Sequence, residues 1–337
     1  MNTAQVNYVN IGLMIVSAAV GLFLPFELFL FSYIVLGPLH YLTEIAWLHK
    51  RQYFSPGRWD VGVLLVLFGI AMLPTFYRWL MTHAGAPSAD DTPQYKVLLD
   101  VGRVVLFVSF AAAAAMVFTR DVYKRVAAII VAVVVGFVFR THAFITILFA
   151  LFIPTLIHVF LFTGAFILVG ALKSRSVSGI LSLVVFVGCA VALLVLWPSP
   201  VNHSSQRVMQ AYSEGFARLN KQIFATFLHR SADANSLYYS PAGIIITRFI
   251  AYAYTYHYLN WFSKTSVIRW HKVPPRALVA IVLVWIAALA IYAANYATGV
   301  AVLYFLSLLH VVVEFPLNFQ SFRDIGREMV KLSRRQG

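Results

Sequence analysis

The stretch AAIIVAVVVGFVF, Ala127–Phe139, is apolar at almost every position, and its apolar residues do not alternate with polar ones. A strand of a membrane barrel would alternate, whereas a helix immersed in lipid is apolar on all faces. Several other runs reach the roughly 20 residues that span a hydrocarbon core as a helix. The whole chain is 61% hydrophobic and 11% charged, against about 25% charged in soluble domains. The sequence therefore predicts an all-α, polytopic transmembrane helical bundle.

About ten spans are expected, and we interpret residues 1–337 as a single integral-membrane domain. The sixth expected span is long and contains Pro154, which predicts a kink or a strong tilt because proline removes a helix hydrogen bond. The expected spans are 7–25, 27–48, 60–80, 97–118, 124–140, 143–172, 177–197, 241–262, 276–295 and 299–318.

The basic residues predict the orientation of this layout. If the amino terminus is cytoplasmic, most of the 26 Lys and Arg fall in cytoplasmic loops and in the carboxy-terminal tail. The positive-inside rule then favours ten spans with both termini cytoplasmic, as in a protein of the bacterial inner membrane. The net charge of +14 is accounted for by this bias and by contact with anionic lipid of the bilayer, so nucleic acid is not expected as a partner.

The segment at about 203–232 has a different pattern. Its apolar residues recur at helical spacing, and its charged residues fill the other face. This pattern indicates an amphipathic helix that lies in the membrane interface. Two roles remain open: a connector packed on the bundle, or a lid that guides a lipid-soluble ligand.

Four of the ten histidines lie well inside expected spans: His40, His158, His257 and His310. Ionisable side chains at membrane depth cost several kcal/mol and mark functional sites by default. Their spans run in the same direction, and their depths at about 1.5 Å per residue allow all four to meet in one half of the bundle. Four neutral imidazoles suit Fe(II), with Zn and Cu as competitors, and a b-type haem held by two of them is not excluded. Each histidine alone is also a reasonable helix–helix hydrogen-bond partner.

Two glutamates follow two of these histidines by one helical turn, in HYLTE and HVVVE. Glu44 comes four residues after His40, and Glu314 four residues after His310, so each pair shares a helix face. Each carboxylate is expected either to accept the N–H of a metal-binding imidazole or to bind the metal directly. Glu44 and Glu314 are therefore candidate catalytic residues.

Aromatic residues surround His257 in AYAYTYHYLNWF. Tyr254, His257, Tyr258 and Trp261 follow helical spacing and could form an aromatic wall beside a metal. Such a wall would suit a flat, conjugated or long apolar substrate, with Tyr254 as a candidate catalytic residue. The alternative is an ordinary aromatic belt at the membrane interface.

The stretch GPLHYLTEI resembles the first motif of the Brp/Blh-type membrane β-carotene dioxygenases, which is Gly, Leu, Pro, His, Gly, two residues and Asp. Gly37, His40 and Glu44 are in register with that motif. The late stretch YTYHYLNWFSKTSVIRWH is similar to the family's late histidine region, and His310 is similar to its last histidine. The resemblance implies an all-helical enzyme in which His40, His257 and His310 bind a non-haem iron, Glu44 supports His40, and β-carotene is cleaved with O₂ to retinal.

The chain also departs from that family. Pro38 and Leu39 are exchanged, Tyr41 replaces a glycine, and the family's second histidine motif has no counterpart. Our own inference is that His158 takes the place of the missing ligand. The leading hypothesis is thus an iron oxygenase acting on a lipid-soluble, carotenoid-like substrate. The alternatives are a transporter or channel that moves protons, metal ions or small solutes past in-membrane His and Glu residues, and a membrane scaffold.

Overall fold

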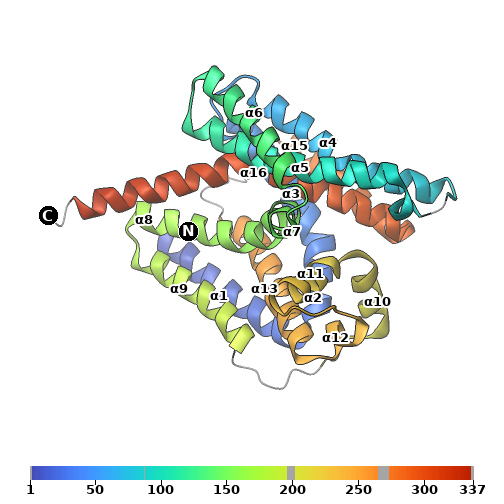
Figure 1. The fold of residues 1–337 in the computed structure, drawn as a ribbon. Coiled ribbons are helices and arrows are strands. Elements are labelled where there is room, and N and C mark those ends of the chain that lie inside the picture. Colours follow the sequence, from blue (N-terminus) through green and yellow to red (C-terminus); the bar gives the residue numbers. More distant parts are fainter. Residues whose placement is uncertain (1, 87, 196–201, 265–272, 335–337) are drawn as a thin grey trace. The chain divides into compact units, whose positions relative to one another are not determined.

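The fold is seen in a computed structural model that describes residues 2–86, 88–195, 202–264 and 273–334. Within these residues every regular element is a helix, joined by turns and short loops (Figure 1). Nine of the described helical segments are long and apolar enough to cross a membrane. The predicted all-α polytopic bundle is therefore confirmed.

Each of the ten expected spans corresponds to a described helix or to a run of consecutive helices. Some runs are interrupted by wider π-helical turns or followed by short 3₁₀ turns, both labelled η. The elements are α1 (Thr3–Phe23), α2 (Pro25–Phe31), η1 (Ser32–Leu36), α3 (Gly37–Lys50), η2 (Gln52–Phe54), α4 (Asp60–His83), η3 (Ala89–Asp91), α5 (Pro93–Phe118), α6 (Val122–Phe139), α7 (Ala143–Ile147), η4 (Leu148–Phe162), α8 (Thr163–Ser174), α9 (Val177–Val195), α10 (Gln206–Gly215), α11 (Arg218–Phe227), α12 (Ala234–Tyr238), α13 (Pro241–Ser263), α15 (Pro275–Ala294) and α16 (Tyr296–Ser333).

The last helix differs most from its expected length. The sequence predicted a span that ends at 318, whereas α16 continues to Ser333. Its extension contains no proline and a single glycine, Gly326, so nothing in the backbone chemistry stops the helix. Pro316 lies inside α16 and does not end it.

The chain divides into two compact units. Unit 1 contains residues 1–40, 156–284 and 324–337, and unit 2 contains residues 41–155 and 285–323. The predicted single domain covering residues 1–337 stays a prediction. Each unit is described by itself below.

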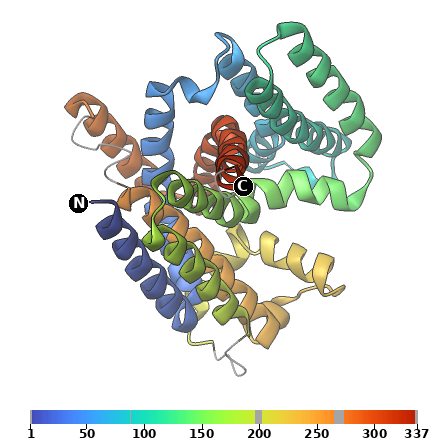
Figure 2. The same cartoon turned by 90° about the vertical axis from the view of Figure 1, so that its left-hand side faces the viewer.

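Unit 1 is built around α13. Helices α1, α2 and α9 all pack against it, and α8 packs against α9 (Figures 1 and 2). The apolar centre combines Met14 of α1 and Phe186 of α9 with Tyr252 and Tyr256 of α13. The stretch from Ile250 to Tyr258 is buried at every position, so this part of α13 is enclosed by protein on all sides.

This enclosure explains why α13 carries so many polar groups. Of the ten expected spans, it is the one that falls outside the nine highly apolar segments. Its hydroxyl groups find partners on neighbouring helices: Thr255 pairs with Ser32 at 2.6 Å, and the Tyr256 hydroxyl donates to Asn10 at 3.0 Å. A polar residue in an apolar layer is tolerated when it faces protein and forms hydrogen bonds.

The amphipathic segment forms two helices rather than one. Helices α10 and α11 are separated at Phe216–Ala217, and they pack on α2 and α13 respectively. The buried Tyr212 hydroxyl donates to Asn220 at 2.6 Å, and Asn220 donates in turn to Thr247 of α13 at 2.7 Å. Burial raises the pKa of the Tyr212 phenol well above its ordinary range, so it stays a neutral donor. Helices α10 and α11 therefore form a layer packed on α2 and α13. A role of this layer as a lid stays a prediction.

Unit 2 contains helices α4, α5 and α6, which follow one another along the chain. In this unit α4 packs against α5, and α5 packs against α6 (Figure 1). Val104 and Val108 of α5 form an apolar centre with Ala132 of α6. At one end of α6, Arg125 binds Asp60 of α4 with distances of 2.8 and 3.0 Å from Nη1 to the two carboxylate oxygens. The same guanidinium donates to the carbonyl groups of Met116 and Thr119. This buried pair joins three helices or their ends in one hydrogen-bonded group.

We expect Arg125→Ala to lower the free energy of unfolding by about 3 kcal/mol, because it leaves the Asp60 carboxylate buried without its cation. The side chains of this pair are only 10% and 9% exposed. Thermal or denaturant unfolding of the detergent-purified protein would measure the change.

Lys124→Ala is the matched control, since Lys124 precedes Arg125 and pairs with Asp121 at 4.0 Å with side chains 74% and 43% exposed. Its loss should cost less than about 0.5 kcal/mol. Equal losses in the two variants would contradict the assigned role of Arg125.

Candidate metal centre

Three of the four predicted histidine ligands lie in unit 1, on three different elements. His40 is near the start of α3, His158 lies in η4, and His257 lies in α13. Their exposed fractions are 1%, 1% and 5%. They are at least 99 residues apart along the chain, and the fold brings their rings together.

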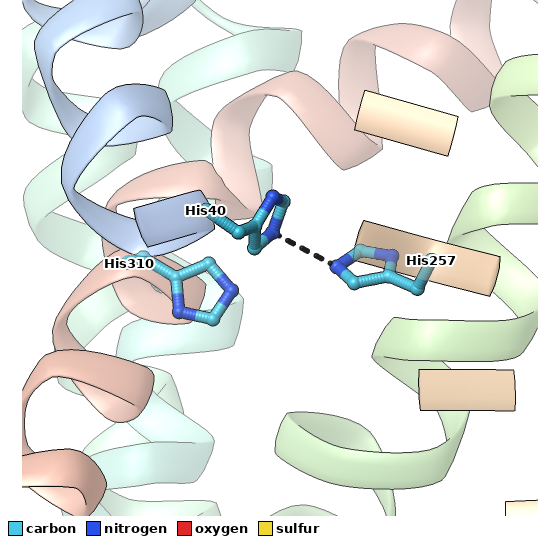
Figure 3. Close-up of side chains that lie close together, drawn as sticks. All are labelled: His40, His257 and His310. Carbon is cyan, nitrogen blue, oxygen red and sulfur yellow. Dashed lines mark hydrogen bonds between the residues drawn. The ribbon is translucent and has the colours of Figure 1, made fainter. Parts of the chain in front are cut away.

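The rings of these three histidines form a connected group. The His40 and His257 centroids are 4.8 Å apart, and those of His158 and His257 are 4.9 Å apart. Nε2 of His40 lies 3.1 Å from Nε2 of His257, as Figure 3 shows. Two nitrogen ligands held at about 2.0–2.1 Å from one ion are separated by about 2.8–3.0 Å at octahedral angles and about 3.3–3.4 Å at tetrahedral angles. The observed distance therefore suits either a direct hydrogen bond or a shared metal ion.

Thr163, the first residue of α8, bonds to the other nitrogen of His257. Its Oγ1 lies 2.7 Å from Nδ1 of His257. When Nδ1 donates its proton to Oγ1, Nε2 carries a free lone pair and can bind a metal. When Oγ1 donates instead, Nε2 carries the proton and donates to His40. The Thr163 hydroxyl group can accept or donate this hydrogen bond. In both cases it fixes the orientation of the His257 ring.

Two of the three histidines follow or lie within π-helical segments. η1 immediately precedes α3, and His158 lies in η4, which also contains Pro154. The expected kink at Pro154 takes the form of this wider helix. Residues five apart share a side in a π-helix, which places Thr163 one π-turn after His158. Both segments thus alter which side chains point into unit 1.

Aromatic rings enclose His40. The ring of Tyr258 lies 5.0 Å from it and that of Trp261 lies 5.6 Å from it. Tyr254, one turn before Tyr258, packs instead against Phe29 and Tyr33, at 5.2 and 5.8 Å. The predicted aromatic wall thus includes Tyr258 and Trp261 beside His40, while the contacts of Tyr254 are with other aromatic residues. A catalytic role for Tyr254 stays a prediction.

The remaining predicted residues lie in unit 2. His310 of α16, also drawn in Figure 3, stacks on Tyr41 with the ring centroids 4.2 Å apart. Glu44 and Glu314 are both buried, and their carboxyl groups lie within electrostatic reach of each other. Two such groups repel when both are charged, and a bound cation relieves the repulsion.

Sequence reasoning missed two residues that belong to these groups. Thr163 could not be found from helical spacing, because its partner His257 lies on another helix, 94 residues away along the chain. Asn318 continues the four-residue spacing of His310 and Glu314 on α16 and is buried, with no hydrogen-bond partner for its amide atoms among the described residues. Asn318 is the last residue of the expected span 299–318, and its four-residue spacing from Glu314 was a signal that the sequence reasoning did not use.

No protein-family model, curated protein or solved structure matches this chain. The resemblance to the β-carotene dioxygenases therefore rests on the quoted residues, and residues 265–271 of its late stretch lie outside the described part of the chain. The described residues establish a coarser description. The chain is a membrane-helical protein with buried histidine clusters that could bind a metal ion.

We expect Thr163→Val to weaken metal binding by roughly 10- to 100-fold, because the orienting partner of the His257 imidazole is lost. Thr163→Ser keeps the hydroxyl group and should bind metal almost as the wild type does. Competition with a chromophoric chelator would measure the affinity.

Thr255→Val is a control for the loss of a buried hydroxyl group, since Thr255 also lies in α13 and pairs with Ser32 at 2.6 Å. It should lower thermal stability and weaken metal binding much less than Thr163→Val does, because Thr255 does not contact the metal-facing ring. If both valine variants weakened metal binding equally, the orienting role of Thr163 would be rejected.

Proposed function

We propose that this protein is an integral-membrane metalloenzyme, a non-haem iron oxygenase that acts on a lipid-soluble, carotenoid-like substrate. One observation carries the proposal: the Nε2 atoms of His40 and His257 converge to 3.1 Å inside a buried part of unit 1. The adjacent ring of His158 supports it.

A purely structural role explains this cluster less well. A helix–helix hydrogen bond needs two polar groups, whereas three imidazoles on three elements gather here. Each additional polar group adds a desolvation cost in the membrane that packing with an aliphatic residue would avoid. A metal ion offsets this cost because it uses the lone pair of each ring.

The donor set favours a divalent transition metal. Imidazole nitrogen suits Fe, Zn and Cu, and geometry and availability decide among them. Three histidines leave positions open on an octahedral ion, which is the arrangement that catalytic sites need. When bound, iron would supply the one-electron chemistry with O₂ that the side chains of this chain lack. His40 and His257, whose Nε2 atoms converge, would hold the ion, His158 is a further predicted ligand beside them, and Thr163 would keep the His257 ring in place.

The surroundings favour an apolar substrate. Tyr258 and Trp261 present ring surfaces beside His40. Aromatic faces pack well against flat, conjugated groups, and a lipid-soluble substrate would reach them from the bilayer. The carotenoid itself comes from the sequence resemblance and is part of the proposal.

The residues of unit 2 have a further predicted role. Glu44 follows His40 by one turn of the same helix, α3, so its carboxylate shares a helix face with that ligand. The supporting role of Glu44 and the ligand roles of His310 and Glu314 stay predictions from the sequence. These assignments are separable from the three-histidine set by mutation.

Metal analysis of the purified protein tests the site directly. We expect about one equivalent of transition metal, with iron dominant after expression in iron-replete medium and no haem absorption band. His40→Ala, His158→Ala and His257→Ala should each lower metal affinity by at least roughly tenfold, because each removes one ligand.

His83→Ala is the matched control, because His83 is exposed and its ring bonds to the Trp79 carbonyl oxygen and to Thr298 of unit 2. It should keep the wild-type metal content. Absence of stoichiometric Fe, Zn, Cu and haem from the wild-type protein would end the metalloenzyme proposal.

An activity measurement tests the oxygenase proposal. We expect the iron-loaded protein to consume O₂ together with β-carotene in mixed micelles and to release an aldehyde detectable by chromatography. His257→Ala should lower the rate below about one hundredth of the wild-type value, since the ion is no longer held.

Two outcomes would contradict this reaction. A zinc-loaded protein that is as active as the iron-loaded one would exclude redox chemistry. Metal-dependent ion flux in proteoliposomes without O₂ consumption would instead favour a transporter that uses the same histidines.

A further inference from the structure

An open crevice lies within unit 2, lined by residues of α5, α6, α7 and η4. Its lining includes none of the histidines and carboxylates discussed above. Arg103 of α5 and Arg140, which ends α6, contribute to its lining. Of the ten described residues that line it, none is acidic.

The two arginines keep unused hydrogen-bonding capacity. Nη1 of Arg103 donates to Asp100 at 3.0 Å, and its side chain is 35% exposed. Nη1 of Arg140 donates to the carbonyl oxygen of Phe137 at 2.7 Å. A guanidinium group has five N–H donors, so most of the donors remain available to a ligand at both residues. Asp100 neutralises one of the two charges, which leaves this end of the crevice cationic.

Apart from Thr146, whose hydroxyl group donates to the Arg140 carbonyl oxygen at 3.0 Å, the rest of the lining is apolar and aromatic. Phe107 and Phe149 meet edge to face with their centroids 4.7 Å apart. Val104 and Ile145 add aliphatic surface. The crevice therefore combines a cationic end with an apolar wall, which is the polarity of an amphiphile.

The helix ends place this crevice at a membrane boundary. α6 is an apolar helix of 18 residues that ends at Phe139, and α7 begins at Ala143 after a short turn. A helix of that length just spans a hydrocarbon core, so Arg140 lies at the level of lipid headgroups. Arg103 lies at the same level, because the neighbouring Val104 contacts Gly136 in the last turn of α6.

From these observations we propose that the crevice binds an anionic phospholipid. The phosphate group would accept hydrogen bonds from Arg103 and Arg140, and the first part of an acyl chain would lie along Phe107 and Phe149. Arginine binds phosphate through two parallel hydrogen bonds, and such charge-assisted bonds are about twice as strong as neutral ones. A soluble anion would use the arginines but not the aromatic wall.

Lipid titration followed by native mass spectrometry tests this proposal on the full chain in a mild detergent. Phosphatidylglycerol and phosphatidylcholine with identical acyl chains are compared. We expect the first bound phosphatidylglycerol to be preferred by roughly tenfold, as one charge-assisted contact would give. The double variant Arg103→Gln/Arg140→Gln should lose most of this preference.

Arg78→Gln is the matched control. Arg78 also lies in unit 2 and pairs with an aspartate, Asp90, at 2.7 Å, but it does not line the crevice. It should keep the wild-type preference, and thermal unfolding of all variants checks that each is folded. A preference that is unchanged in the double variant, or absent from the wild type, would overturn the proposal.

Soluble competitors separate lipid from free anion. Excess inorganic phosphate or glycerol 3-phosphate should displace little bound phosphatidylglycerol, because neither contacts the apolar wall. Displacement by either at concentrations equal to that of the lipid would show that the crevice is an anion site without lipid selectivity, and would overturn the proposal as well.

Discussion

Unit 1 depends on one constraint: the polar groups of α13 must be enclosed and bonded, because an apolar layer offers them no water. Thr247, Thr255 and Tyr256 each meet a partner on another element. An unbonded polar group in an apolar layer destabilises the fold by more than its packing contacts stabilise it. The enclosure that satisfies α13 also fixes the position of His257, and with it the arrangement of the candidate metal centre.

Preorganisation follows from that enclosure. Thr163 holds one nitrogen of the His257 ring, and the other nitrogen faces His40. Ligands held in this way lose little conformational freedom when a metal binds, which raises affinity. The π-helical turns of η4 are part of this arrangement, because they change the phase of the helix between His158 and Thr163.

Unit 2 handles its charges in a different manner. Asp60 and Arg125 form a buried pair whose remaining donors and acceptors are bonded to the chain. Arg103 and Arg140 stay partly exposed and line a crevice with aromatic residues. Charges near the ends of apolar helices can reach the headgroup region, and there they can recognise lipid at a small desolvation cost.

The sequence by itself determined the helices, because they follow from local apolar runs, and the fixed rise of a helix gave the predicted depth of the histidines. Only the tertiary structure decided that His40 and His257, 217 residues apart, face each other. It also decided that Thr163 orients His257, that α10 and α11 are separate, and that α16 extends to Ser333. The physical reason is that ring-to-ring contacts depend on how the helices pack and on which way each helix is rotated about its axis. A uniformly apolar sequence specifies neither of these.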